Sequence, residues 1–109
     1  MSTLSTHVLD TALGRPAQGI RVTLERADDV VGSGVTDADG RVRDLHKKDV
    51  PLSQGTYTLT FYVAEYFSKA GRESFFPEVV VNFRIDGGAE HYHVPLLLSP
   101  FGYSTYRGS

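Results

Sequence analysis

The sequence of 109 residues has room for one domain, and we expect a single domain over residues 1–109 that buries a core of its own. Its 11 lysines and arginines nearly balance its 13 aspartates and glutamates. The net charge of −2 argues against a nucleic-acid partner bound through bulk positive charge and against binding to anionic membranes. Without cysteine there are no disulfides, thiolate metal sites or cysteine nucleophiles, so the chemistry must come from four histidines, the other charged residues and the hydroxyls.

No stretch approaches the roughly 20 apolar residues of a membrane-spanning helix. The first seven residues also lack the basic start and apolar stretch of a secretory signal. We therefore expect no membrane partner and a cytoplasmic protein, or a periplasmic one if a signal peptide has been removed.

Strand-like alternation of apolar and polar side chains dominates the chain. The clearest case is 56–63, where Tyr57, Leu59, Phe61 and Val63 fall on one face. The segments predicted to be strands are 4–9, 20–25, 30–36, a short one at 41–45, 56–63, 78–86, 91–98 and 102–107.

Clusters of glycine, proline and aspartate, such as 37–40 and 86–88, separate these segments. Only residues 64–71 fit a helix, about two turns long and ending at Gly71. A series of about eight short strands predicts an all-β fold. We expect an antiparallel β-sandwich of two sheets, with about eight strands and one short helix. Pro95 conflicts with the strand at 91–98 and predicts a bulge or an interruption of its hydrogen bonding.

The histidines fall on a defined face of two predicted strands, because side chains alternate along a strand. In the first strand, His7 lies opposite the face formed by Leu4, Thr6 and Val8. In the strand at 91–98, one face is strongly apolar and is predicted to face the core; its residues are Tyr92, Val94, Leu96 and Leu98. His7 and His93 are therefore both expected on the outer face of the sandwich, close together if the two strands are neighbours.

Several interpretations of the histidines stay open at this point. A histidine on an outer face is most often simply solvated, and His46, in a polar loop, is interpreted as a surface residue. The pair His91 and His93 has the spacing of half a metal site, but this interpretation is the weaker one and no metal is expected. Imidazole titrates near neutral pH, so an acid–base role is also open.

An outer sheet face is open, whereas hydrolytic chemistry needs a concave and partly dry site. Leu9 and Leu97 would also expose apolar area on this face. Both difficulties disappear if two subunits pack outer sheet on outer sheet. We therefore expect an oligomer whose interface forms the pocket.

The run HYHVPLLLSPFGYSTYRGS at 91–109 resembles the signature of the 5-hydroxyisourate hydrolases, the transthyretin-related enzymes of urate breakdown. The opening LSTHVLD at 4–10, with Gly14 and Pro16 after it, resembles their N-terminal motif, and Asp39-Gly40-Arg41 resembles their central Gly-Arg. The stretch 55–81 is similar in order, so the resemblance covers nearly the whole chain. The same family includes transthyretin, a carrier of thyroid hormone with this fold and no hydrolase activity.

The resemblance implies a transthyretin-like sandwich that assembles as a homotetramer, a dimer of dimers, with active sites in the channel between the dimers. It implies a small-molecule substrate, 5-hydroxyisourate, whose N1–C6 bond is hydrolysed to give 2-oxo-4-hydroxy-4-carboxy-5-ureidoimidazoline. No cofactor or metal is implied.

The resemblance also implies which residues act. The catalytic set is His7, Arg41, His93 and Ser109, and the substrate-binding set is His7, Arg41, Tyr106, Arg107 and Gly108. The two histidines would activate water and transfer protons, in an order that stays open, and the two arginines would bind the acidic heterocycle and its developing charge. Tyr106 would wall or hydrogen-bond the substrate, Ser109 would offer its hydroxyl and the terminal carboxylate, and His91 would be a supporting neighbour. Spacing alone would make Arg41 only a surface residue beside a turn.

Two other classes compete with the hydrolase. One is a transthyretin-like carrier of small aromatic ligands, and the other is a non-enzymatic partner domain, which a monomer with a solvated outer face would favour. The complete set of His7, Arg41, His93 and the ending Tyr-Arg-Gly-Ser favours the hydrolase. By this resemblance the ending is native rather than a remnant of an expression vector.

Overall fold

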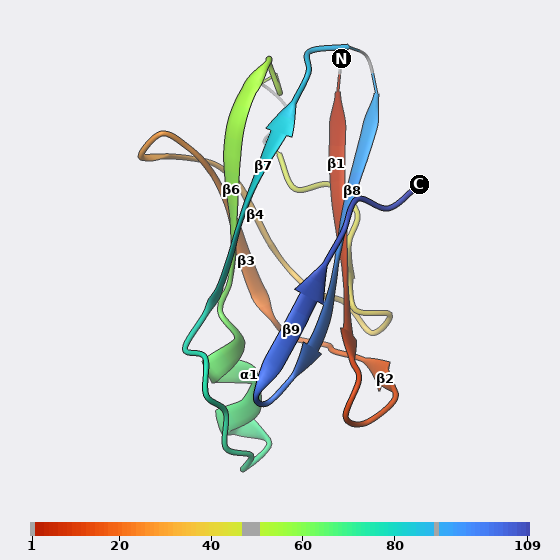
Figure 1. The fold of residues 1–109 in the computed structure, drawn as a ribbon, viewed down its shortest axis with the longest axis vertical. Helices are drawn as coiled ribbons and strands as arrows, with labels where there is room; N and C mark the ends of the chain where they lie inside the picture. The colour runs from red at the N-terminus through yellow and green to blue at the C-terminus, as the bar shows by residue number, and fades with distance from the viewer. Residues whose placement is uncertain (1, 47–50, 89) are drawn as a thin grey trace.

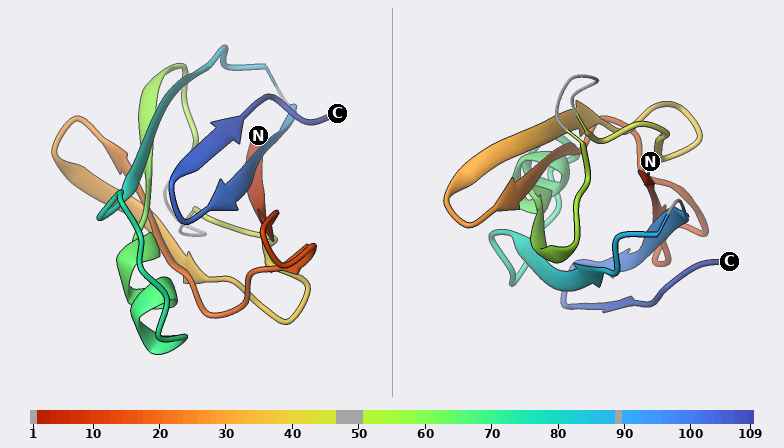
Figure 2. Two further views of the ribbon diagram at one scale, coloured as in Figure 1. Left: turned by 60° about the horizontal axis from the view of Figure 1, so that its bottom comes forward. Right: turned by 90° about the horizontal axis from the view of Figure 1, so that it is seen from above.

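The structure, a computed structural model, describes residues 2–46, 51–88 and 90–109. Two β-sheets face each other with the core between them, and one helix lies at the end of the sandwich away from the N-terminus (Figure 1; Figure 2). The first sheet has the order β2-β1-β8-β9, with β5 also paired to β1, and the second has the order β4-β3-β6-β7. The two-sheet sandwich predicted from the strand pattern is confirmed.

The elements follow the predicted segments closely. The first sheet consists of β1 (Thr3–Asp10), β2 (Arg15–Pro16), β5 (Arg41–Val42), β8 (His91–Ser99) and β9 (Gly102–Thr105). The second consists of β3 (Arg21–Arg26), β4 (Asp29–Val35), β6 (Gly55–Phe61) and β7 (Val79–Ile85), and the helix is α1 (Val63–Lys69). The helix gives way to a turn at Ala70 and Gly71, and Gly71 has a φ of 66°, a conformation that glycine adopts without strain.

One strand pair departs from the expected antiparallel pattern. Strands β1 and β8 run parallel, from Thr3 opposite His91 to Asp10 opposite Leu98. A parallel pair needs a long crossover, and here the whole second sheet lies between the two strands in the sequence. The first sheet is therefore mixed rather than wholly antiparallel.

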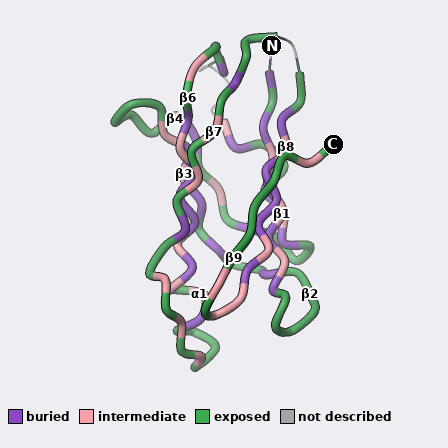
Figure 3. Tube along the Cα trace, in the orientation of Figure 1, coloured by how far each residue is buried: buried purple, intermediate pink, exposed green. Residues whose placement is uncertain are grey.

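The predicted alternation along β1 and β8 is confirmed (Figure 3). The inward residues of β1 and those of β8 are buried, while His7 is half-buried and His91 is exposed on the other face. The inward set is Leu4, Thr6, Val8 and Asp10 in β1, with Tyr92, Val94, Leu96 and Leu98 in β8. The two histidine-bearing strands are thus direct neighbours, with the same face outward.

The interruption predicted at Pro95 is confirmed on the β9 side alone, since pairing of β8 with β1 continues through His7 opposite Pro95. Pairing of β8 with β9 ends at Leu96 opposite Thr105 and resumes only at an isolated bridge between His93 and Gly108. Proline has no amide hydrogen to donate to this ladder. The C-terminal residues therefore leave the strand opposite Pro95 and return to the sheet at His93.

The described residues include no helix that is long and apolar enough to cross a membrane.

Candidate active site

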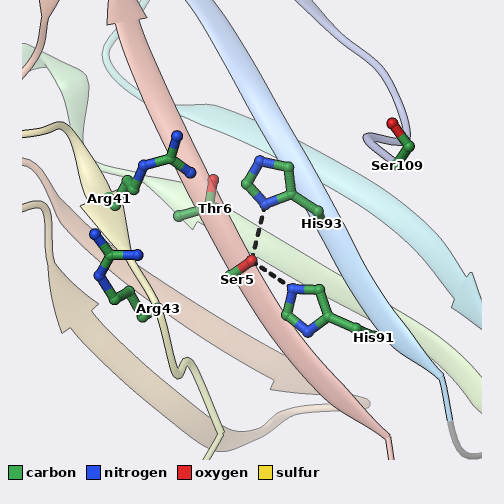
Figure 4. A pocket seen from close by; sticks show the side chains of 7 residues that line it. All are labelled: Ser5, Thr6, Arg41, Arg43, His91, His93 and Ser109. Atoms are coloured by element: carbon green, nitrogen blue, oxygen red, sulfur yellow. Dashed lines mark hydrogen bonds between the residues drawn. The ribbon is translucent and has the colours of Figure 1, made fainter.

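A cavity of about 460 Å³ lies on the outer face of the first sheet (Figure 4). Strands β1, β5 and β8, the segment after β5 and the C-terminus all contribute to it. Its lining residues are Ser5, Thr6, Arg41, Arg43, His91, His93 and Ser109. Of the predicted catalytic residues, Arg41, His93 and Ser109 thus border one cavity.

His93 is half-buried at the centre of this arrangement. Its Nδ1 atom is 2.8 Å from the hydroxyl of Ser5, which is also 2.9 Å from Nε2 of His91. The pKa of His93 is lowered from 6.5, chiefly because burial disfavours the charged ring, further by the positive charge of Arg41, and by repulsion from His7 and His91 when those rings carry a proton. The imidazole of His93 is therefore neutral at pH 7 and able to accept a proton.

A tight turn fixes the backbone of Arg41. The carboxylate of Asp37 accepts hydrogen bonds from the backbone amides of Asp39 and Arg41, both at 2.9 Å. Gly40 has a φ of 76°, and a Cβ atom there would lie 2.4 Å from the carbonyl oxygen of Val8. Only glycine allows the turn to approach β1 this closely.

This approach pairs Arg41 with His7. The two residues lie opposite each other in the antiparallel pair of β5 and β1. His7 does not line the cavity itself. It stands two residues after Ser5 on the same face of β1, a step of about 6.6 Å along the strand. His7 is thus a near neighbour of the cavity, and its charge contributes to the lowered pKa of His93.

The C-terminal segment divides between two cavities. Ser109 lines the first, whereas Tyr106 and Arg107 line a second cavity of about 300 Å³, with His93 as a wall common to both. The guanidinium of Arg107 lies 4.7 Å from the ring centre of Tyr92, and its Nη2 is 3.7 Å from a carboxylate oxygen of Glu90. In this single chain Arg107 and Arg41 therefore do not meet.

Gly108 holds the segment against His93. Its amide donates to the carbonyl of His93 at 2.8 Å. A Cβ atom at this position would lie 2.5 Å from Cδ2 of the imidazole.

The expectation that His46 is a surface residue is wrong. Its side chain is only 7% exposed, and its Nδ1 atom is 3.3 Å from a carboxylate oxygen of Asp44. The polar loop sequence around it gave no sign of this burial. No group of three or more histidine, aspartate or glutamate side chains arranged to hold a metal ion occurs in the described part of the chain.

Sequence reasoning missed three polar residues that organise the site and its strands. The first two are Ser5 and Asp37. Ser5 could have been found from the alternation of β1, because it lies on the same outward face as His7. The third is Asp10, fully buried at the end of β1, whose carboxylate accepts from Arg72 at 2.7 Å and from the hydroxyl of Tyr66 at 2.7 Å. The alternation of β1 puts Asp10 inward, but no sequence pattern reveals a partner 62 residues away.

Two sheets in this order, with one short helix after β6, define a transthyretin-like β-sandwich. A model of the HIUase/Transthyretin family matches residues 4–108, and the chain belongs to this family.

Within the family, the chain is similar to the 5-hydroxyisourate hydrolase of Salmonella typhimurium, with 46% identity over 97% of this chain and 80% of that protein. It is 43% identical to the 5-hydroxyisourate hydrolase of Caulobacter vibrioides over the full length of both. The solved structure of Klebsiella pneumoniae 5-hydroxyisourate hydrolase is similar at a TM-score of 0.89 and 45% identity, covering 100% of this chain and 94% of that one.

Sea bream transthyretin in complex with thyroxine is similar at a TM-score of 0.88 and 30% identity, covering 97% of this chain and 94% of that one. The fold is therefore common to both kinds of relative, whereas the identity is higher to the hydrolases. The chain is an enzyme of the hydrolase class.

Proposed function

We propose that the protein hydrolyses 5-hydroxyisourate, opening its six-membered ring at the N1–C6 bond to give 2-oxo-4-hydroxy-4-carboxy-5-ureidoimidazoline, a step of urate breakdown. The observation that carries the proposal is a cavity bordered by a neutral histidine, His93, and a fixed cation, Arg41, in a chain 43–46% identical to proteins named 5-hydroxyisourate hydrolase. Attack of water on an acyl carbon requires a base and a group that stabilises the developing oxyanion.

In this proposal His93 is the base. Its Nδ1 is engaged by Ser5, so Nε2 is the ring nitrogen available to a water molecule. The water oxygen bonds to C6 while its proton moves to Nε2, and the C6–N1 bond then breaks as N1 takes up a proton. We assign this second proton transfer to His7, which stands on the same face. Positioned acid–base groups of this kind contribute roughly 10²–10⁴ to a rate.

The two arginines supply positive charge to the substrate and the transition state. A guanidinium is planar, always charged and able to donate two parallel hydrogen bonds to an acidic heterocycle. Arg41 already borders the cavity, whereas Arg107 would leave Glu90 to reach the substrate. That ion pair is more than half exposed, and exposed ion pairs contribute only about 0–1 kcal/mol. The movement would also break the contact of Arg107 with the Tyr92 ring, which is of similar size at about 0.5–1 kcal/mol. Tyr106 then walls the substrate, Gly108 keeps the segment close to His93, and Ser109 orients a neighbouring donor.

We further propose that the enzyme is a homotetramer, a dimer of dimers, with each active site between dimers. Support comes from the position of the cavity on an outer sheet face and from aromatic side chains exposed on the C-terminal part of the chain. Phe101, Tyr103 and Tyr106 are all more than 40% exposed at the C-terminal end of the chain. A second copy packed here would cover this area and exclude water from the cavity.

The direct test is to add the purified protein to freshly generated 5-hydroxyisourate and to follow the decay of its ultraviolet absorbance. We expect decay far faster than the spontaneous rate, in proportion to enzyme concentration, and a large loss with His93→Asn. Decay at the spontaneous rate with folded protein would refute the proposed activity.

A carrier of small aromatic ligands is the second candidate, favoured by the likeness to sea bream transthyretin in complex with thyroxine. Equilibrium binding of thyroxine separates the two candidates. The hydrolase proposal expects catalysis without tight thyroxine binding, whereas a carrier would bind thyroxine and leave 5-hydroxyisourate untouched.

A further inference from the structure

The hydroxyl of Ser5 stands between two imidazoles. It is 2.8 Å from Nδ1 of His93 and 2.9 Å from Nε2 of His91 (Figure 4). The other nitrogen of His91, Nδ1, is 2.5 Å from the hydroxyl of Thr3. The four side chains form one hydrogen-bonded chain along the seam of β1 and β8, in the order Thr3, His91, Ser5, His93.

The number of available protons restricts this chain. A serine hydroxyl has one proton to donate, and a neutral imidazole has one protonated and one unprotonated nitrogen. Ser5 therefore cannot donate to both rings, and at least one of the two rings must donate to Ser5. The protonated nitrogen of His93 decides its chemistry, because only an unprotonated Nε2 can take a proton from water.

We propose that Ser5 is a positioning residue that fixes the tautomer of His93: His93 donates its Nδ1 proton to Ser5, Ser5 donates to Nε2 of His91, and His91 donates its Nδ1 proton to Thr3. This direction places the protons of His93, Ser5 and His91 between two protein atoms and leaves the hydroxyl proton of Thr3 outside the chain. It leaves Nε2 of His93 as an unprotonated acceptor on the side of the cavity where the guanidinium of Arg41 lies (Figure 4). The inference rests on the proposed function in that it gives His93 the role of base.

The position of Arg41 supports this direction, because the positive charge of its guanidinium favours an unprotonated Nε2 of His93 over an N–H group there. Hydrogen bonds that run in one direction along a chain also polarise and strengthen one another. When His93 takes a proton at Nε2, its Nδ1–H bond to Ser5 becomes charge-assisted and holds the ring in place.

The environment of His93 otherwise opposes protonation. The charged or titratable groups that face it are Arg41 from β5, His7 from β1 and His91 from β8, and all three disfavour a second positive charge. The Ser5 backbone acts in the other direction, and a hydrogen bond from the protonated ring to the Ser5 hydroxyl would do the same, because it favours the charged form. Removing the hydroxyl should therefore have two effects. The proton of neutral His93 should no longer be held on Nδ1, and the pKa of His93 should be lowered further.

The first experiment measures the tautomers directly. Long-range ¹H–¹⁵N correlation spectra of the ¹⁵N-labelled full-length protein distinguish a protonated Nδ1 from a protonated Nε2 in each histidine at pH 8. We expect both His91 and His93 to carry the proton on Nδ1, and His93 to lose this preference in Ser5→Ala. A proton on Nε2 of either ring in the unmodified protein would overturn the proposed chain.

The second experiment is kinetic, with 5-hydroxyisourate as the substrate. In Ser5→Ala we expect kcat to fall about tenfold to a hundredfold, KM to change little, and the acid limb of the kcat profile to move to lower pH. Ser5→Thr keeps the hydroxyl and should restore both values, and Ser33→Ala makes the same change at an exposed site on the other sheet and should alter neither. An unchanged kcat and acid limb in Ser5→Ala would overturn the role of Ser5.

The two experiments separate the two proposals. If the unmodified protein fails to accelerate the decay of 5-hydroxyisourate, the proposed function fails, while the tautomer spectra still decide the hydrogen-bonded chain. If decay is accelerated and the spectra show Nε2 protonated, only the chain fails.

Discussion

The amide of Gly108 donates to the carbonyl of His93 at 2.8 Å, and a Cβ atom at Gly108 would lie 2.5 Å from Cδ2 of the same histidine. The penultimate residue of the chain therefore packs directly on an imidazole of the candidate active site. This contact is the point at which the C-terminal segment returns to the sheet after Pro95 interrupts its pairing. It gives a residue without a side chain a specific place in the site.

Gly108→Ala should impair catalysis without unfolding the protein. The added methyl group must displace either the His93 ring or the last two residues, and a shift of about 1 Å in a catalytic group can cost about a hundredfold in rate. We expect kcat to fall by at least tenfold and the unfolding midpoint to change little, because the segment lies at the edge of the sheet. Enzyme assays and thermal unfolding of the same sample check this, and full activity would show that the contact does not position His93.

His93→Asn should lower turnover and leave the oligomer intact. In the unmodified enzyme, kcat/KM should fall as the pH drops, because a protonated imidazole cannot accept a proton from water. The pKa of His93 in the free protein is lowered from 6.5, and kcat/KM reports the free enzyme, so the midpoint of this acid limb should lie below 6.5. The variant should lack this limb, and sedimentation velocity should show the same assembly. Activity loss that follows dissociation would instead make His93 structural.

The same shift has a consequence for stability. The unfolded chain, with an ordinary histidine pKa near 6.5, binds a proton at a higher pH than the folded chain does. The folded state therefore loses stability as the pH falls below 6.5 toward the lowered pKa of His93. Chemical denaturation at several pH values measures the free energy of unfolding. As the pH falls below 6.5, this free energy should decrease less steeply in His93→Asn than in the unmodified protein.

A truncated chain that ends at Thr105 should fold and lose ring opening. Strand β9 ends at Thr105, so the deletion leaves its pairing with β8 intact and removes Tyr106, Arg107 and the residues that contact His93. Circular dichroism should show the unchanged β spectrum, and the absorbance assay should show decay near the spontaneous rate. Unchanged turnover would refute the role assigned to the C-terminal residues.

Arg72→Met should destabilise the fold by about 3–5 kcal/mol, because it leaves the fully buried carboxylate of Asp10 without its charged partner. Burial alone would raise the pKa of Asp10, but the hydrogen bonds from Arg72, Tyr66 and the amide of Leu13 lower it below its usual value. Stability from this group is present above the unfolded pKa of about 3.9 and is lost as the pH falls through the lowered value.

In Arg72→Met this acid loss should begin at a higher pH, since burial then dominates the pKa of Asp10. Arg43→Met provides the control, because Arg43 pairs with Asp39 at 3.9 Å while both side chains are more than 70% exposed. Its cost should stay below about 1 kcal/mol. Equal losses in the two variants would show that the buried pair contributes no more than a surface pair.

The sequence was most informative in the long strands, where apolar and polar side chains alternate strictly from one residue to the next. Alternation put His7 and His93 on one face because each belongs to a long strand with an apolar opposite face. The same alternation fits a parallel and an antiparallel neighbour equally well, so the parallel pairing of β1 with β8 had no signal in it. Direction depends on the path of the rest of the chain.

Outside the strands, alternation offers no such guidance. The strand predicted at 102–107 ends at Thr105, so Tyr106 and Arg107 lie beyond it, and they line a different cavity from Arg41. His46 lies in a loop, where burial depends on contacts distant in the sequence. The ion pair of Asp10 with Arg72 is equally invisible, because each residue alone is compatible with a solvated position.

The parallel pair of β1 and β8 has a consequence for how the enzyme is made. Thr3 pairs with His91 across 88 residues, and the hydrogen-bonded chain through Ser5 crosses the same seam. Contacts of such long sequence separation form slowly, because most of the chain must be ordered before they close. During synthesis, β1 has no β8 to pair with until residues 91–99 have been added, and its edge stays unprotected during that interval. The face that bears the candidate active site is therefore expected to be among the last parts of the molecule to form.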